Sequence, residues 1–187
     1  MKISQPADTT VLLFTDLPDL DPLRVFLVHH SERQGGITIT CFGEAWSGYW
    51  GAMGKGNGIT GFFLSCDTHY LAGKMKGQDS RDTEPDFDTF KQQLLEAIRN
   101  GEAPVGSHGH QYTAESLEEI EDHEFEAHTV HDDCEANRIA EHYMGEDWYE
   151  QVPHRQTQSY TYLCRIIDAV KAGLKQWQYE QVAKEKA

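Results

Sequence analysis

The stretch from His123 to His142 concentrates side chains that can bind a metal ion. It holds four histidines, one cysteine and six carboxylates within twenty residues. His128, His131 and Cys134 recur every three residues, and His142 follows two helical turns after Cys134. Zinc takes three or four convergent, deprotonated ligands, so these four side chains are candidate ligands. Neither H-E-x-x-H nor a C-x-x-C pair is present, and an acidic, histidine-rich surface without metal is the simpler interpretation.

The same region is strongly acidic. Residues 78–155 contain 21 acidic and 5 basic side chains, whereas residues 1–77 contain 7 and 6 and residues 156–187 contain 3 and 5. The middle segment therefore accounts for the whole formal charge of -15. Such a segment repels nucleic-acid phosphates and attracts basic protein surfaces, with an association that weakens as salt rises.

Two functional hypotheses follow from these patterns. The first is a noncatalytic acidic binder, acting as a nucleic-acid mimic, that inhibits or modulates a basic protein. The densest run of carboxylates supplies the expected contact residues, which are Glu118, Glu119, Glu121, Asp122, Glu124 and Glu126. The alternative is a metal-dependent hydrolase of nucleotides or nucleic acid that uses the histidine and cysteine cluster. The first hypothesis requires no cofactor and the second requires zinc.

Other catalytic patterns are weaker, and we favour a protein without enzymatic activity. Ser107 and His108 have no third partner at a telling spacing. The run "GAMGKGNG" lacks the order of a phosphate-binding loop, because glycine follows its lysine. Glu44 stands beside Trp46 and Trp50, where it is either a buried acid-base group or the first glutamate of a helix.

The flanking segments predict an α+β body. Residues 9–17, 21–30 and 35–43 are rich in Val, Ile, Leu, Phe and Thr and are separated by short polar breaks. They predict a three-stranded antiparallel meander. Apolar residues at helical spacing over residues 160–177 predict a long C-terminal helix that packs on the sheet.

Three helical pieces are expected between the meander and the acidic segment. Trp46, Tyr49, Trp50 and Met53 fall at spacings of three and four, which favours one helical face. Residues 60–66 predict another helical piece, and Asp67 can cap the one after it.

The shift in composition predicts a domain organisation. Residues 1–77 and 156–187 are expected to form the body, and residues 78–155 an acidic, histidine-rich helical insertion. Three helices are expected in the insertion. Asp86 or Asp88 can cap the first, and Asp132 or Asp133 the third.

The chain shows no signs of export. Its first ten residues lack a basic start with an apolar run, no segment is long and apolar enough to cross a membrane, and the four cysteines are scattered. We expect reduced thiols, no contact with a membrane and a location in a cytosol. Oligomeric state cannot be read from these patterns, and the three aromatic residues at 46, 49 and 50 fit a core or an interface.

The segments "CFGEAWSGYWGAMG", "FFLSCDTHYLAGKM" and "YLCRIIDAVKAGLK" resemble uncharacterised proteins from the accessory regions of tailed phages and prophages. The resemblance covers roughly residues 10–77 and 160–175. It implies expression inside a bacterial host cell from a mobile element. In that setting, the expected basic partner is a nucleic-acid-binding or defence protein of the host. It does not extend to residues 78–155, so it implies no function for the acidic segment.

Overall fold

A computed structural model describes residues 9–54, 58–77, 80–100 and 114–185. The chain divides into two compact units. Unit 1 comprises Met1–Asp82 and Thr157–Ala187, and unit 2 is Thr83–Gln156. The predicted α+β class is confirmed, since the described residues combine a four-stranded antiparallel sheet with six α-helices, one of them long and C-terminal. Within the described ranges, no helix is long and apolar enough to cross a membrane.

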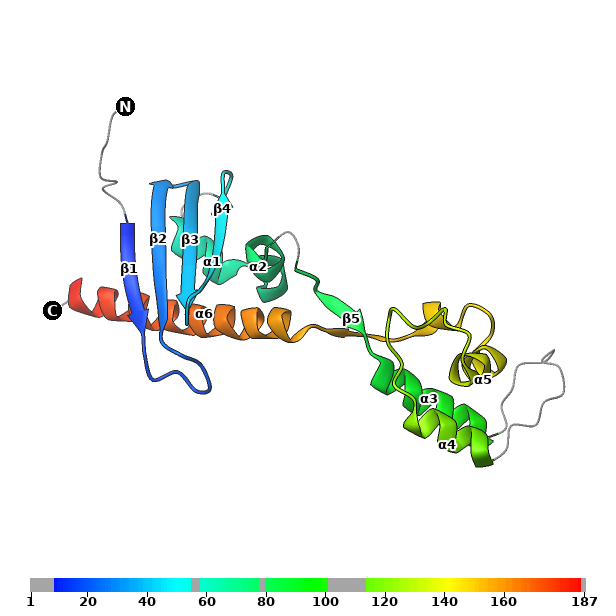
Figure 1. Cartoon of the computed structure of the whole chain (residues 1–187). Helices are drawn as coiled ribbons and strands as arrows, with labels where there is room; N and C mark the ends of the chain where they lie inside the picture. Colours follow the sequence, from blue (N-terminus) through cyan, green and yellow to red (C-terminus); the bar gives the residue numbers. More distant parts are fainter. Residues whose placement is uncertain (1–8, 55–57, 78–79, 101–113, 186–187) are drawn as a thin grey trace. The chain divides into compact units, whose positions relative to one another are not determined.

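The sheet of unit 1 has four antiparallel strands in chain order (Figure 1). They are β1 (Thr9–Phe14), β2 (Leu23–Ser31), β3 (Gln34–Cys41) and β4 (Glu44–Trp50). The first three correspond to the predicted meander. Leu23, Val25 and Leu27 alternate with more exposed residues along β2, so one face of the sheet is buried and the other faces solvent.

The helix predicted over residues 44–53 is wrong, because residues 44–50 form β4. Trp46 and Trp50 lie on the inner face, whereas Tyr49 is 63% exposed on the outer face. Gly48 lies between the tryptophans on the inner face, where a β-carbon would come 2.5 Å from the ring of Trp50. The aromatic residues therefore follow the two-residue period of a strand.

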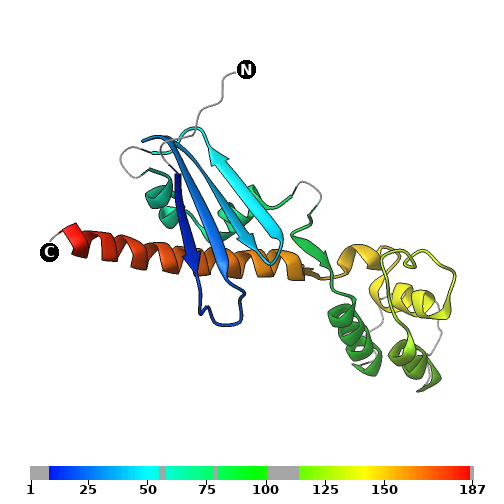
Figure 2. The ribbon, with the colours of Figure 1, turned by 60° about the vertical axis from the view of Figure 1, so that its left-hand side comes forward.

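Three helices cover the inner face of the sheet (Figure 2). They are α1 (Gly58–Ser65), α2 (Thr68–Met75) and α6 (Gln158–Glu185). The predicted cap of α2 is confirmed, since the Asp67 carboxylate accepts hydrogen bonds from the backbone N–H groups of the second and third helical residues at 2.8 and 3.3 Å. The apolar stripe of α6 is buried against the sheet and comprises Leu163, Ile166, Ile167, Val170 and Leu174.

Glycine permits the close approach of α6 to the sheet at one point. A β-carbon on Gly173 would lie 2.9 Å from two ring atoms of Phe14, below the separation that carbon atoms normally tolerate. Phe14 belongs to β1, so this contact fixes where the edge of the sheet lies on the helix.

Unit 2 has a hydrophobic core of its own. It contains α3 (Phe87–Asn100), α4 (Ala114–Asp122), α5 (Glu135–Met144) and the short 3₁₀ helix η1 (Trp148–Gln151). Strands β5 (Thr83–Pro85) and β6 (His154–Gln156) pair at the point where the chain enters and leaves. The buried side chains include Phe90, Leu94, Ile120, Phe125, Ile139 and Trp148. The rings at 90, 125 and 148 lie 5.1 to 5.7 Å apart, which is the usual distance for packed aromatic pairs.

The helix ends of unit 2 are specified differently from one another. Asp86 accepts hydrogen bonds from the N–H and hydroxyl groups of Thr89 at 3.2 and 2.9 Å, which confirms it as a cap of α3. The caps predicted at Asp132 or Asp133 are wrong, since Cys134 is the N-cap of α5 and makes no side-chain capping bond. The Asp133 carboxylate instead accepts hydrogen bonds from Arg138.

Candidate functional site

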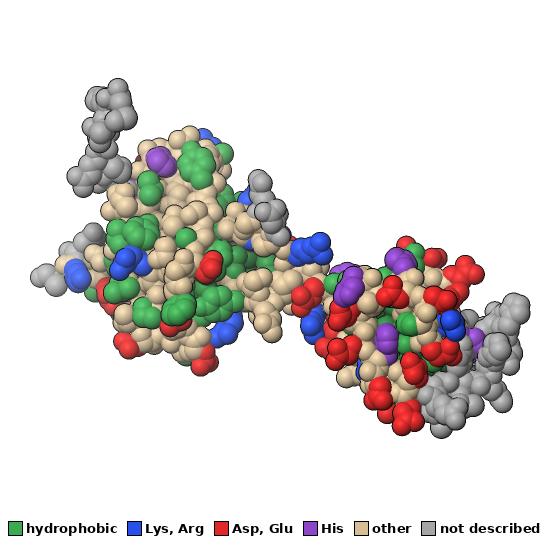
Figure 3. All heavy atoms as spheres, viewed as in Figure 1, with side chains coloured by type: hydrophobic (Ala, Val, Ile, Leu, Met, Phe, Trp, Pro, Cys, Tyr) green, Lys and Arg blue, Asp and Glu red, His purple; other side chains and the backbone are tan. Residues whose placement is uncertain are grey.

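Unit 2 carries the entire net charge of the protein. Residues 83–156 contain 19 acidic and 4 basic side chains, a formal charge of -15, whereas the rest of the chain contains 12 of each. Figure 3 shows Asp and Glu side chains distributed over the surface of this unit. The electrostatic potential around unit 2 is therefore strongly negative, whereas unit 1 has no net charge.

The few basic groups of unit 2 are already engaged. Arg99 pairs with Glu121 at 2.9 Å. Arg138 pairs with two carboxylates at 2.8 and 3.1 Å, and the nearest of these raises the pKa of its guanidinium. Arg155 pairs with three, which likewise raises its pKa. The ammonium of Lys91 donates to two backbone carbonyls, that of Glu121 in the last turn of α4 and that of His123 directly after it. Most carboxylates of unit 2 therefore have no basic side chain of the same unit to pair with.

All six predicted contact residues lie on the surface, on α4 or directly after it. Ile120 and Phe125 point into the core and fix the orientation of this segment. The six carboxylates are exposed around these anchors. Glu121 is held by Arg99, and Glu126 lies 3.0 Å from the imidazole of His128. Within the described part of the chain, the remaining four make no ion pair or side-chain hydrogen bond, and they are Glu118, Glu119, Asp122 and Glu124.

The position of these acids on α4 opposes the helix dipole. Glu119, Glu121 and Asp122 stand in the last turn, where unpaired carbonyls make the helix end negative, and no basic residue shares that turn. Each exposed carboxylate at such an end costs about 0.3–1 kcal/mol at low ionic strength. The ammonium of Lys91, which donates to the backbone oxygens of Glu121 and His123, and the guanidinium of Arg99, which pairs with Glu121, counter part of this effect. The arrangement is unfavourable for folding, as sites selected for binding often are.

The four predicted metal ligands occupy separate places in unit 2. His128 and His131 are exposed in the turns between α4 and α5, and the His131 ring packs edge-on against Tyr149 at 5.1 Å. Cys134 is the N-cap of α5, and His142 lies in the last turn of that helix. Among the residues that the structure describes, no group of three or more His, Cys, Asp or Glu is placed to hold a metal ion. Zinc binding by these residues stays a prediction.

Comparison with known proteins identifies the family. The model of the family Phage_phiTE_072, described as a phage family, matches residues 1–176. The chain belongs to this phage family. The matched range includes unit 2 as well as nearly all of unit 1. No curated protein and no solved structure matches the chain significantly.

The phage protein also has a polar cluster in unit 1 that the sequence patterns did not reveal. The His69 Nδ1 atom lies 3.2 Å from the Tyr160 hydroxyl and 3.8 Å from the Cys164 sulfur. Burial raises the pKa of both the tyrosine and the thiol, and Asp168 raises that of the thiol further. A thiol that stays protonated is a poor nucleophile, so this cluster supports packing of α2 on α6 better than it supports catalysis. His69 lies 91 and 95 residues before Tyr160 and Cys164 in the sequence, so no local pattern links the three residues.

The remaining catalytic candidates find no support in the geometry. Glu44 is exposed at the start of β4, so it is neither a buried acid nor the first residue of a helix. It lines a cavity of about 540 Å³ together with Trp46, Lys76, Tyr160 and other residues of unit 1, and the ammonium of that lysine is paired with the Asp82 carboxylate. Ser107 and His108 lie outside the described residues.

Proposed function

We propose that unit 2 is an acidic binding module through which this phage protein binds, and thereby inhibits or modulates, a basic protein of its bacterial host. The target class is a protein whose basic surface normally binds nucleic acid. The single observation that carries the proposal is the location of the charge: the whole -15 resides in one folded unit, and its partner unit is neutral.

The way the carboxylates are displayed supports recognition more than solubility alone. They lie on helices with a packed core, so the backbone that carries them is already ordered before a partner binds. Four of them on and after α4 are unpaired within the described residues and oppose the helix dipole. Exposed carboxylates along a short helical surface can substitute for a run of phosphates in a basic groove. Direct binding of nucleic acid by this unit is disfavoured by the same charge.

The proposal is tested by capturing partners from a host lysate with the full-length protein at low and at high salt. The test variant removes four charges with almost no change in side-chain size: Glu118→Gln, Glu119→Gln, Asp122→Asn and Glu124→Gln. Exposed ion pairs contribute about 0.2–1 kcal/mol each, so we expect roughly 1–4 kcal/mol weaker binding of the captured protein. Its association rate should fall most, since long-range attraction acts on the encounter.

A matched control removes four exposed charges elsewhere in unit 2: Glu141→Gln, Glu146→Gln, Asp147→Asn and Glu150→Gln. This control should retain most of the binding. A basic protein held at low salt and released at high salt by the wild type and the control, but lost from the test variant, is the expected result. Equal binding by all three proteins, or capture that does not depend on salt, would refute recognition through α4.

A further inference from the structure

Among the residues that the structure describes, nothing pairs with the outer edge of strand β1. It pairs only with β2, in a continuous antiparallel register without a bulge, and no other backbone hydrogen bond reaches it in the described residues. Its sequence, TTVLLF, contains no charged residue and no proline, which are the usual means of blocking an edge. At the opposite edge, α2 packs against β4. An open, uncharged edge of six residues is a template for another strand.

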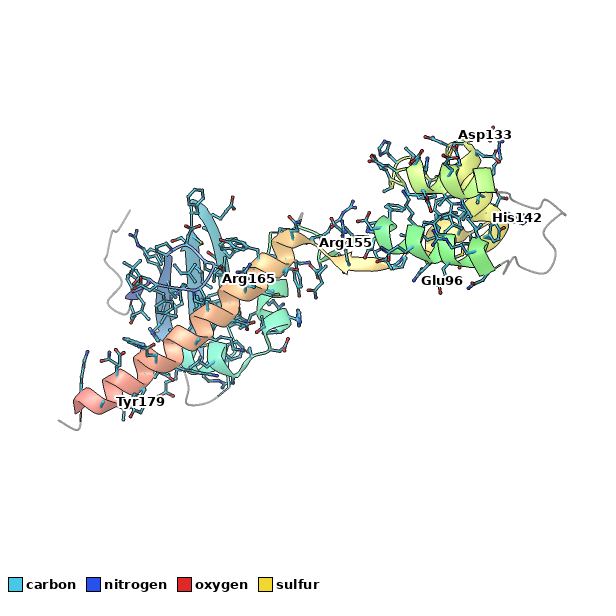
Figure 4. The ribbon with its side chains drawn as sticks, turned by 90° about the horizontal axis from the view of Figure 1, so that it is seen from below. Glu96, Asp133, His142, Arg155, Arg165 and Tyr179 are labelled. Carbon is cyan, nitrogen blue, oxygen red and sulfur yellow. The ribbon has the colours of Figure 1, made fainter. Side chains whose placement is uncertain are left out.

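Exposed apolar side chains gather around this edge. Val11 and Leu13 are 55% and 61% exposed on the outer face, and Val11 lies directly opposite Phe26 of β2. The C-terminal end of α6 extends past β1 in both ribbon views (Figures 1 and 2). That end carries Tyr179, labelled in Figure 4, and Val182, which are 78% and 49% exposed. One edge of unit 1 thus presents apolar groups from two elements.

The charge distribution indicates which partner suits this edge. Two copies of the protein repel each other through unit 2, where each carries -15, but not through the neutral unit 1. A basic partner is drawn by the field to unit 2 instead. The uncharged edge is therefore the place where a second copy can approach most readily.

The strand is also complementary to itself. In an antiparallel pair, residues directly opposite each other point to the same face of the sheet. A two-fold axis normal to the sheet must then lie midway between the two β1 strands, at a level where one residue faces the same residue of the second copy. With the axis at Leu12, Val11 lies opposite Leu13 of the second copy, so the exposed apolar residues cover each other on the outer face. Thr10 then lies opposite Phe14 of the second copy on the inner face.

We propose that two copies of the protein associate through antiparallel pairing of their β1 strands in this register, forming one continuous eight-stranded sheet. The interface is isologous, as in most homodimers. The overhanging ends of the two α6 helices run beside each other beneath the joined edges and bring Tyr179 and Val182 to the interface.

The association is measured by sedimentation equilibrium of the full-length protein over a range of concentrations. The expected species is a dimer with twice the chain mass of 21.3 kDa. Val11→Lys with Leu13→Lys places like charges opposite each other at two points, and we expect this variant to be monomeric. Both side chains are more than half exposed, so the fold should persist, as judged by circular dichroism.

The matched control places the same two charges at exposed apolar residues away from β1. Phe42 and Tyr49 are 88% and 63% exposed, and Phe42→Lys with Tyr49→Lys should leave the dimer intact. A wild-type monomer at every concentration would overturn the proposal. A dimer that survives the lysine pair on β1, or one that both lysine pairs dissociate equally, would also overturn it.

The register is tested by cross-linking under mild oxidation. Opposite residues have β-carbons about 4.5–5.5 Å apart, close enough for a disulfide once the strands adjust. Val11→Cys with Leu13→Cys should yield a covalent dimer that the wild type, with its four buried or half-buried cysteines, does not form. Efficient cross-linking by Val11→Cys alone would place the axis at residue 11 and refute the proposed pairing.

Discussion

The acids in the last turn of α4 should make unit 2 less stable than its fold allows. The test variant is Glu119→Gln with Asp122→Asn, which removes two charges and keeps the side-chain volumes. Each of these carboxylates faces the negative end of the helix dipole and costs about 0.3–1 kcal/mol. Neither has an ion-pair partner in the described residues, so neutralisation sacrifices no attraction. We expect unit 2 to gain about 0.6–2 kcal/mol.

Hydrogen exchange measured by mass spectrometry reports this gain within unit 2 alone. Amides of α3 and α5 that exchange through opening of the whole unit should slow by about three- to thirty-fold, because 1.4 kcal/mol corresponds to a factor of ten. The effect should shrink at high salt, where exposed charges are screened. Amides of unit 1 serve as an internal reference and should not change.

A control with the opposite sign comes from α5. Glu135 stands in the first turn of that helix, where a carboxylate is favoured by the dipole, and it also pairs with Arg138 at 3.1 Å. Glu135→Gln should therefore speed exchange, by about two- to five-fold from the dipole effect alone. The reasoning is refuted if the α4 variant exchanges no more slowly than the wild type, or if its effect is unchanged by salt.

Four further predictions concern three single contacts and the metal content of the protein. Hydrogen bonds from Thr89 lower the pKa of Asp86 below its ordinary value of about 3.9. The ionised carboxylate therefore stabilises the fold above that value, and this stabilisation is lost as pH falls through the lower, folded-state pKa. Asp86→Ala should unfold at a lower urea concentration than the wild type at neutral pH, and the two proteins should become equally stable in strong acid. The hydrogen bond between the Tyr162 hydroxyl and the Cys41 sulfur, 3.4 Å long, raises the pKa of Tyr162 to about 12. The unfolded chain loses this proton near pH 10, so the stability of the fold should decrease between about pH 10 and 12. Cys41→Ala should bring the pKa of the tyrosine, followed by ultraviolet absorbance, toward its ordinary value. Gly173→Ala must displace the ring of Phe14, so it should cost about 1–3 kcal/mol in urea unfolding despite the better helix propensity of alanine, and Phe14→Leu in the same chain should relieve part of that loss. Elemental analysis of untagged protein should find no stoichiometric zinc, and a chelator should leave the unfolding temperature unchanged; one zinc per chain would instead indicate that the four candidate ligands rearrange around it.

Periodicity and turn chemistry predicted most elements but misplaced one. The apolar spacing of Trp46 and Trp50 fits a helix and an inward-facing strand equally well, because four residues make about one helical turn and two strand repeats. The deciding signal was the turn before them. Phe42 and Gly43 both have positive φ, 44° and 89°, and form a two-residue hairpin connection that commits the next segment to pair with β3. A glycine in such a loop predicts a hairpin better than aromatic spacing predicts a helix.

The helix starts in unit 2 show why local signals are incomplete. Asp86 and Asp133 both precede helices and both suit a cap by residue type. Only Asp86 caps, because Thr89 offers its N–H and hydroxyl groups, whereas Asp133 meets the guanidinium of Arg138 five residues later. A charged partner within reach competes with backbone capping, and the outcome depends on geometry that a sequence does not state. The cluster of His69, Tyr160 and Cys164 escaped for a related reason, since it forms only when α2 meets α6.

The candidate binding surface was predictable in composition but not in its energetics. Counting charges locates the acidic segment, yet the count does not tell which carboxylates are already paired. The structure separates Glu121, which Arg99 neutralises, from Glu118, Glu119 and Asp122, which remain available. If acidity served solubility alone, its position along a helix would be free, and acids would be expected to gather at helix starts, where they also stabilise. At the end of α4 the acids lower the stability of the fold. A partner that brings positive charge to that end would reduce both the repulsion among the acids and their unfavourable interaction with the helix dipole. Binding at α4 should therefore stabilise unit 2, and hydrogen exchange in the presence of a captured partner should slow most in α4 and in the parts of α3 and α5 that pack against it.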